Sequence, residues 1–345
     1  MKLIVQIPCY NEESTLPAVI ASIPRRIEGI DCVEVLVVDD GSTDRTAEVA
    51  RLSGAHHVVR HKTNRGLAEA FQTGLDACLR LGADIVVNTD GDNQYPQADI
   101  PLLIKPILEE RADVVVGDRQ TGKIAHFSRQ KKFLQAIGSL TVRFLSGTAV
   151  PDAPSGFRAY SREAAMRLNV VTRYTYTIET LLQAGMQRTA ITSVPISVNE
   201  TTRQSRLVKS LWSYVKQSAA TIVRTYAMYQ PLKVFFYIGT ALCFVGLAGT
   251  IRFLYYFFSG DGGGHVQSLI LSAVCLIVGF QVMLIGLLAD LIAANRKLIE
   301  NTLYRVKTIE MQLARHKSLD GESEDAGNAG DTGDHTPSLP LSAGR

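Results

Sequence analysis

Two aspartates at the end of an apolar run are the residues whose types and spacing most clearly suggest chemistry. Residues 86–96 read VVNTDGDNQYP, so Asp90 and Asp92 are separated by one residue, and Gln94 continues the same row. On an extended chain, side chains two positions apart point to the same side and can converge on one point. Because converging carboxylates repel each other unless a cation lies between them, the spacing predicts a cation site at Asp90 and Asp92.

The elements that would carry these side chains alternate between strand-like and helical segments. Short β-branched runs are separated by amphipathic stretches such as EESTLPAVIASIPRRI, and the runs cover residues 3–8, 33–40, 56–61, 83–90 and 112–119. This alternation is typical of βαβ units and predicts an α/β fold with a mostly parallel sheet. Ligands of such sheets bind at the carboxyl ends of the strands, which is where the polar residues of this sequence gather.

Polar clusters also follow the first, second and fifth of these strands. They read PCYNEE (8–13), VVDDGSTD (37–44) and GDR (117–119). The second cluster supplies carboxylates for a ribose or a base edge, a glycine turn, and a helix N-terminus that Ser42 or Thr43 would cap. Together with the aspartate pair, these clusters predict a nucleotide pocket next to a cation site.

Two long apolar segments near the carboxyl end predict a pair of transmembrane helices. Residues 268–289 contain no charged side chain, and residues 234–258 contain only Arg252. As a helix, either segment is long enough to cross a hydrocarbon layer of roughly 30 Å. The alternative is a buried helical hairpin in a soluble protein, but uncharged helices of this length are rare in that class.

The charges beside these segments predict their orientation. Residues 203–233 carry six lysines and arginines and no acid, four more basic residues lie between 296 and 307, and the connection SGDGGGH has no lysine or arginine. By the positive-inside rule, the α/β domain and both termini lie in the cytoplasm of a two-span inner or plasma membrane protein. Residues 204–232 are typical of basic amphipathic helices on the membrane surface, and the alternative is a solvated helix face.

The composition therefore predicts five successive regions. They are an α/β domain at 1–203, amphipathic juxtamembrane helices at 204–232, two spans within 233–292 (about 234–258 and 267–290), a cytoplasmic helix at 293–317 and a disordered tail at 318–345. The tail is predicted because its Gly, Ser, Asp and Pro residues leave little apolar surface to bury.

Other features of the sequence argue against several functional classes. Five cysteines occur without paired spacing, so we expect reduced thiols and no zinc site. His57 and His61 flank a strand-like VVR and give only a weak indication of a metal site, against an ordinary exposed loop edge. The start MKLIVQIPCYNEE lacks the apolar core of a signal peptide, and we expect no nucleic-acid partner.

Six motifs in a fixed order carry a family resemblance. PCYNEE, VVDDGSTD, NRGLAEAFQTG, TDGDNQYP, SGFRAYSR and SVPI resemble, in that order, the family 2 glycosyltransferases of GT-A fold. Over residues 1–300 the chain is most similar to the dolichyl- or polyprenyl-phosphate glycosyltransferases with two C-terminal transmembrane helices. The resemblance implies an inverting transfer of a sugar from a UDP- or GDP-linked nucleotide-diphosphate sugar to polyprenyl phosphate at the cytoplasmic face of the membrane.

The resemblance also implies residues for the donor and the metal. The nucleotide pocket would be lined by Pro8, Tyr10, Glu12 and Asp40, and Mg²⁺ or Mn²⁺ on the donor diphosphate would be held by Asp90, Asp92 and Gln94. Hard oxygen ligands in a partly open site suit either ion. Arg203 resembles part of the family's mobile segment over the diphosphate, and the alternative is the start of the basic surface helix.

Basic residues after the fifth strand lie where the similar enzymes grip the acceptor phosphate. The implied set is Arg119, Arg129, Lys131, Lys132 and Ser155, with a solvated basic helix as the alternative for the lysines. Two residues depart from the family pattern. Gln135 stands where the family has a serine, and Asp118 replaces the serine of the usual Gly-Ser-Arg.

The charge changes of the reaction indicate which groups are catalytic. Breaking the bond from sugar to diphosphate builds negative charge on the diphosphate, so a cation at Asp90 and Asp92 and a guanidinium at Arg119 would favour the transition state. A lipid phosphate is already an anion near neutral pH and needs positioning rather than a general base. For Glu179 we therefore favour a packing or pocket-organising role over that of a base.

Two other functions stay open on the sequence. One is a polysaccharide synthase or a transferase to a different lipid hydroxyl, although no Gln-x-x-Arg-Trp motif occurs and two spans make a poor polymer channel. The other is a catalytically silent membrane scaffold that uses the helix at 291–316 for assembly, against which the intact Asp90 and Asp92 count. A homo-oligomer is compatible with each of these functions.

Overall fold

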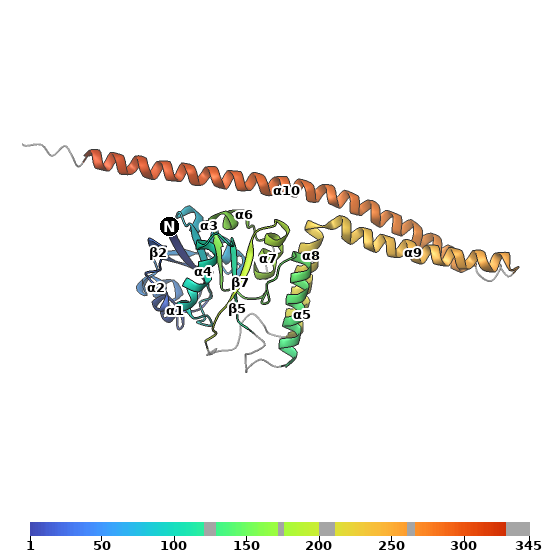
Figure 1. Ribbon diagram of the computed structural model, residues 1–345, viewed down its shortest axis with the longest axis horizontal. Coiled ribbons are helices and arrows are strands. Elements are labelled where there is room, and N and C mark those ends of the chain that lie inside the picture. The colour runs from blue at the N-terminus through green and yellow to red at the C-terminus, as the bar shows by residue number, and fades with distance from the viewer. Residues whose placement is uncertain (121–128, 172–175, 200–210, 261–265, 329–345) are drawn as a thin grey trace, which may run out of the picture.

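The computed structural model describes residues 1–120, 129–171, 176–199, 211–260 and 266–328. Figure 1 shows a central sheet with helices packed around it. The sheet has seven strands in the order β3-β2-β1-β4-β6-β5-β7. The strands are β1 (Lys2–Cys9), β2 (Cys32–Asp39), β3 (His57–Arg60), β4 (Ile85–Asn88), β5 (Val114–Asp118), β6 (Arg158–Ser161) and β7 (Ile191–Pro195). The predicted α/β fold with a mostly parallel sheet is confirmed.

One strand runs against the others and brings a loop to the functional edge of the sheet. β6 pairs antiparallel with β4 and with β5, so that its first residue, Arg158, lies opposite Asn88 at the end of β4. The loop that enters β6 therefore reaches the carboxyl edge of the neighbouring strands, where the exits of the parallel strands also lie. The sequence pattern identified this segment as a motif and not as a strand.

Helices cover both faces of the sheet because alternate strand residues point to opposite sides. In β1, Ile4 belongs to one core cluster, whereas Leu3, Val5 and Ile7 belong to the other. The first cluster includes residues of α3 (Leu67–Arg80), α5 (Arg129–Ser146), α6 (Arg162–Arg167), α7 (Tyr176–Met186) and α8 (Leu211–Tyr229). The second includes residues of α1 (Leu16–Ser22), α2 (Thr46–Leu52) and α4 (Ile100–Leu108), which follows the short 3₁₀ helix η1 (Gln97–Asp99).

The start of α2 differs from the prediction that Ser42 or Thr43 would cap it. The helix begins at Thr46, whose backbone N–H donates to the Asp44 carboxylate at 3.0 Å. Ser42 Oγ instead accepts a hydrogen bond from the backbone N–H of Asn11 at 2.9 Å. The hydroxyls that looked available for capping are thus used to join the loops after β1 and β2.

Two long helices, α9 (Pro231–Phe258) and α10 (Val266–Asn328), are apolar and long enough to cross a membrane. Small residues allow their backbones to approach closely: a Cβ on Gly239 would lie 2.7 Å from the Gly279 carbonyl oxygen, and one on Gly246 would lie 2.8 Å from that of Ser272. Large apolar side chains on the outside of the pair are solvent-exposed, such as Phe244 at 72% exposure. This exposure favours a membrane pair over the alternative of a buried hairpin.

The carboxyl half of α10 corrects two predicted boundaries. We expected a span to end near residue 290, a separate helix at 293–317, and a disordered tail from 318. The structure has one continuous helix from Val266 to Asn328, and residues 329–345 lie outside the described part. No Gly or Pro occurs between residues 287 and 317 to interrupt it, and extending an existing helix costs much less than nucleating a new one.

The extended half of α10 lies across the α/β domain (Figure 1). Lys307 Nζ lies 2.8 Å from Asp76 Oδ1 on α3, and the Arg167 guanidinium of α6 lies 4.9 Å from the centre of the Tyr304 ring. Met311 packs against the first core cluster. One helix therefore provides a candidate span and a contact with the domain.

Candidate active site

The loop that follows β4 is held by a buried network of hydrogen bonds. Asn88, the last residue of β4, accepts a bond from Gln6 Nε2 at 2.9 Å and donates to the Gly156 carbonyl and the Tyr176 hydroxyl, each at 2.8 Å. Both N–H donors of the Asn88 side-chain amide are used, and its oxygen accepts the bond from Gln6. The network joins β1, β4, the loop into β6 and α7 immediately before Asp90.

Glycine allows the loop into β6 to approach the first aspartate. A Cβ added to Gly156 would lie 3.1 and 3.2 Å from the two Asp90 carboxylate oxygens and 2.9 Å from the Tyr176 hydroxyl. Gly91, between the two aspartates, is equally confined, because a Cβ there would lie 2.8 Å from Cys9 Sγ at the end of β1. A larger residue at Gly156 would press on Asp90 and Tyr176, and one at Gly91 would press on Cys9.

A third carboxylate approaches the aspartate pair from the loop after β1. The Thr15 hydroxyl lies 2.7 Å from the Gly91 carbonyl oxygen and 3.0 Å from Glu12 Oε2, so it joins Glu12 to the loop that carries the two aspartates. The Asp92 carboxylate accepts a bond from the backbone N–H of Gln94 at 3.1 Å. The structure thus brings Glu12 and the predicted pair together at one edge of the sheet.

The proximity of these groups changes the protonation of Asp90. Burial, followed by the negative charges of Asp92 and Glu12, raises the pKa of Asp90 to about 7, although Arg119 and Arg158 oppose the rise. A group of carboxylates that cannot all ionise without a counter-charge fits a divalent cation. Within the described residues, no group of three or more His, Cys, Asp or Glu side chains is arranged to hold a metal ion. A cation at Asp90 and Asp92 would therefore need further oxygen ligands, such as water or a donor phosphate.

The residues predicted to bind the nucleotide surround this edge. Tyr10 is 40% exposed just beyond β1, and Pro8 is buried within β1 opposite Val38. Asn11, in the left-handed conformation with φ 55°, accepts a bond from the Thr43 backbone at 2.9 Å. The loops after β1 and β2 thus form one continuous wall, and the contacts of these residues with a nucleotide stay a prediction.

Asp40 organises the loop before α3. Its carboxylate accepts the backbone N–H groups of Arg65 and Gly66 at 2.9 and 2.8 Å, and it lies 2.7 Å from His61 Nδ1. His57 pairs instead with Glu34 at 2.8 Å. The two histidines therefore serve separate carboxylates, which is against the weak alternative of a shared metal site.

Arg119 is oriented by an acid that sequence reasoning missed. Its Nε and Nη2 donate to the two carboxylate oxygens of Asp152 at 2.7 and 2.9 Å, and the side chains are only 10% and 2% exposed. Such a bidentate pair fixes the plane of the guanidinium. The available signal was an acid three positions before Ser155, in the loop that leads into the SGFR motif.

A buried arginine supports the same loop. Arg158 is fully buried and donates to the carbonyls of Ser155 and Ala153 at 2.8 and 2.6 Å and to Thr180 Oγ1 at 2.8 Å. The Ser155 hydroxyl is buried and has no hydrogen-bond partner within the described residues. An unpaired buried hydroxyl beside the aspartate loop is compatible with the predicted contact to a ligand phosphate.

The remaining predicted residues lie on α7, in the first turn of α5, and outside the described part of the chain. Glu179 on α7 is buried and accepts bonds from the Val171 backbone at 2.9 Å and from Gln183 at 3.1 Å, which favours the packing role. The backbones of Arg129, Lys131 and Lys132 lie in the first turn of α5, but their side chains lie outside the described part. Arg203 also lies outside the described residues.

The raised pKa of Asp90 predicts how stability depends on pH without metal. Between about pH 4 and 7, folded Asp90 keeps a proton that the unfolded chain loses, so stability falls as pH rises, by at most about 1.4 kcal/mol per pH unit. We expect the melting temperature of the full chain, in detergent and chelator, to fall between pH 5 and 8. Asp90→Asn should flatten this fall, whereas Glu48→Gln, at an exposed carboxyl of α2, should not. An unchanged slope in Asp90→Asn would contradict the assignment.

Comparisons with known proteins agree with this arrangement. Residues 4–168 match glycosyl transferase family 2, and residues 230–294 match the GtrB C-terminal hairpin. The dolichyl-phosphate hexose transferase of Haloferax volcanii is 32% identical over 205 residues, which are 59% of this chain and 86% of that protein. The undecaprenyl-phosphate mannosyltransferase of Micrococcus luteus is 29% identical over 210 residues, or 58% of this chain and 84% of that protein.

A solved structure shares the fold. The crystal structure of glucosyl-3-phosphoglycerate synthase from Mycobacterium tuberculosis, in complex with Mn²⁺, UDP and glucosyl-3-phosphoglycerate, matches with a TM-score of 0.53 and 28% identity. The match covers 66% of this chain and 80% of that chain. The chain belongs to glycosyl transferase family 2 and is a glycosyltransferase with a GT-A domain and a GtrB-type C-terminal hairpin.

Proposed function

We propose that this glycosyltransferase moves a sugar from a nucleotide-diphosphate sugar to polyprenyl phosphate. The observation that carries the proposal is the meeting of Asp90, Asp92 and Glu12 with Arg119 at one edge of the sheet, in a chain with two helices able to span a membrane. Carboxylates that hold a cation suit a diphosphate donor, and a guanidinium suits a phosphate acceptor. The printed names of the Haloferax and Micrococcus relatives, a dolichyl-phosphate and an undecaprenyl-phosphate transferase, support this acceptor class.

The donor would be held through a divalent cation. Asp90, Asp92 and Gln94 are the residues that would hold Mg²⁺ or Mn²⁺, and the raised pKa of Asp90 is the feature of this chain that fits it. When bound, the ion would act as a Lewis acid that neutralises charge on the departing diphosphate. The Mn²⁺ and UDP in the crystal structure of the Mycobacterium synthase support this assignment.

The chain's own residues would position the acceptor without taking a proton from it. A lipid phosphate is already ionised near neutral pH, so its oxygen can attack the sugar once it is oriented. Arg119 would orient it, because the pair with Asp152 limits the positions that the guanidinium can take. Glu179 is bonded to the Val171 backbone and would serve to hold α7 rather than to act as a base.

The active site would face the cytoplasm. Basic residues cluster beside both spans, and the connection between the spans has none, so the positive-inside rule places the α/β domain and both termini on the cytoplasmic side. Nucleotide sugars are cytoplasmic metabolites, which agrees with this orientation. The same reasoning predicts an inner or plasma membrane location.

The metal assignment can be tested by substitution and by chelation. Asp92→Asn removes one negative ligand, and we expect transfer from a radiolabelled nucleotide sugar to polyprenyl phosphate to fall by at least about 100-fold. Chelator should abolish wild-type transfer, and added Mn²⁺ should restore it. Asp99→Asn, which changes a carboxylate bonded to Ser197 rather than the pair, is the matched control. Wild-type transfer by folded Asp92→Asn in excess chelator would refute the metal role.

The acceptor assignment is best tested with a variant that does not leave a buried charge without its counter-charge. Arg119→Ala alone would leave the buried Asp152 carboxylate without the guanidinium that balances its charge, and removal of one partner from a buried ion pair costs about 3–5 kcal/mol of stability. In the double variant Arg119→Gln/Asp152→Asn, we expect kcat/KM for polyprenyl phosphate to fall roughly ten- to a hundredfold, the worth of a charge-assisted contact. Hydrolysis of the donor should change much less.

Glu179→Gln serves as the contrasting variant in the same steady-state assay. It should keep substantial turnover, because a phosphate nucleophile needs no base. A collapse of turnover in Glu179→Gln, with the Arg119 and Asp152 double variant near wild type, would mean that the acceptor is a hydroxyl.

The orientation can be tested with single cysteines in a cysteine-free variant. A cysteine at Gly262, between the spans, should react with an impermeant thiol reagent in intact cells, whereas one at Arg315 should react only after lysis. The reverse labelling pattern would place the active site outside.

A further inference from the structure

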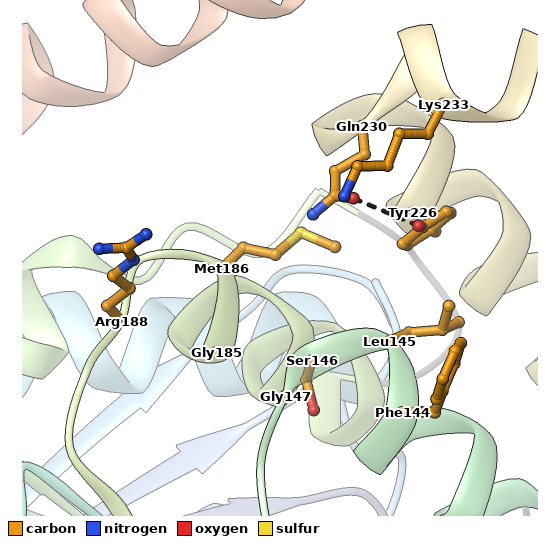
Figure 2. A pocket seen from close by; sticks show the side chains of 10 residues that line it. All are labelled: Phe144, Leu145, Ser146, Gly147, Gly185, Met186, Arg188, Tyr226, Gln230 and Lys233. Carbon is orange, nitrogen blue, oxygen red and sulfur yellow. Dashed lines mark hydrogen bonds between the residues drawn. The ribbon is translucent and has the colours of Figure 1, made fainter. Parts of the chain in front are cut away.

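A cavity beside the start of α9 lies outside the site described above. It has a volume of about 430 Å³ and is bounded by the ends of α5, α7 and α8 and by the first turn of α9 (Figure 2). The side chains that matter below are Phe144, Met186, Arg188, Tyr226, Gln230 and Lys233. The elements that form it are far apart in the sequence and meet only where the domain adjoins the candidate membrane helices.

The cavity lies near the amino ends of the parallel strands, whereas the catalytic loop follows their carboxyl ends. β7 runs parallel to β5, and both run parallel to β4 because each of β4 and β5 is antiparallel to β6. Asp90 follows the end of β4, whereas Arg188 precedes the start of β7 at Ile191. A ligand in the cavity would therefore not be in the position of an acceptor that reacts at Asp90.

The charged residues that line the cavity are all basic. Of the ten residues labelled in Figure 2, Arg188 and Lys233 are cationic and none is acidic. Neither cation has an ion-pair partner in the described part of the chain, unlike Lys307 or Arg119. In the view of Figure 2, Arg188 lies on one side of Met186, and Lys233 lies on the other beside Gln230. Two exposed cations that line one cavity with no acid among its lining residues favour an anionic ligand.

The lining includes a turn residue with an unusual backbone conformation and a side-chain amide with an available donor. Arg188 adopts φ 57°, a left-handed conformation that favours glycine, in the turn that ends α7. The Tyr226 hydroxyl donates to Gln230 Oε1 at 3.2 Å, which leaves the amide nitrogen of Gln230 as a donor.

The depth of the cavity identifies the class of ligand. Lys233 is the third residue of α9, so the cavity is level with the point where the first candidate span begins. This is the headgroup layer of a bilayer, where lysine, arginine and aromatic side chains gather. Phe144 and Val223 are 85% and 66% exposed on the neighbouring α5 and α8 and could contact acyl chains there.

We propose that this cavity binds the headgroup of an anionic phospholipid, whose phosphodiester pairs with Lys233 and Arg188. Basic pockets at the membrane surface are a recurrent means of binding such lipids. The bound lipid would connect α9 to the ends of α5 and α7, and so anchor the sheet edge opposite the active site to the membrane. The proposal depends on α9 entering the membrane and not on the identity of the donor or the acceptor.

The test measures lipid binding directly. Short-chain phosphatidylglycerol would be titrated into the full chain in uncharged detergent and the complex counted by native mass spectrometry. We expect one tightly bound molecule and an affinity about thirtyfold weaker in Arg188→Gln/Lys233→Gln. The matched control, Lys216→Gln/Arg224→Gln, removes the same charge from exposed positions of α8 and should bind as wild type does. Equal affinity in both double variants, or no binding to wild type, would overturn the proposal.

Two further measurements distinguish a phospholipid from a soluble phosphate and from the acceptor lipid as the ligand of the cavity. Inorganic phosphate and phosphatidylcholine, at the same concentrations, should not compete with phosphatidylglycerol, because one lacks acyl chains and the other lacks net charge. Effective competition by inorganic phosphate would identify a soluble-anion site instead. The pocket double variant should also keep the wild-type KM for polyprenyl phosphate, whereas a selective rise in that KM would mean that the cavity belongs to the acceptor. Either result would refute a separate phospholipid site.

Discussion

Repulsion among carboxylates at one edge of the sheet is the interaction on which the rest of the active site depends. Asp90 is removed from water beside Asp92 and Glu12, and this raises its pKa to about 7 even though Arg119 and Arg158 act in the opposite direction. Groups arranged in this way would separate or hydrate unless the surrounding structure held them. The surrounding structure therefore keeps these carboxyl groups together against their repulsion, and a cation bound between them, as proposed above, would relieve it.

The topology of the sheet explains how these groups are held together. A purely parallel sheet would bring only strand exits to this edge, whereas the antiparallel β6 adds an entering loop that carries Asp152, Ser155 and Gly156. Gly156 allows that loop to approach the Asp90 oxygens. The buried Arg158 holds the loop by donating hydrogen bonds to two of its backbone carbonyls. The charged side chains of the site thus come from two kinds of loop, those that follow parallel strands and the one that enters β6. β6 joins them because it pairs with both β4 and β5.

The sequence was sufficient for features that are local in the chain. Strand runs, the aspartate pair and the two spans follow from periodicity and composition, which need no knowledge of distant contacts. The ion pair of Arg119 with Asp152 joins residues 33 positions apart, and the bond of Asn88 to Tyr176 joins residues 88 apart, so neither has a local signal. The cap of α2 and the end of α10 were wrongly predicted for a related reason: tertiary partners took the hydroxyls, and helix continuity overrode a polar composition.

The contacts of α10 with the domain differ in strength according to their exposure. The pair of Arg80 with Glu310 has side chains 69% and 55% exposed and contributes little, as surface pairs do. Lys307 with Asp76, at 15% and 33%, is better shielded, and Met311 packs on the core itself. A straight helix rises about 1.5 Å per residue, so the distance from the span to these contacts is set by helix length. Since α8 also packs on the first core cluster and leads into α9, the α/β domain is connected to the pair of apolar helices through both α8 and α10.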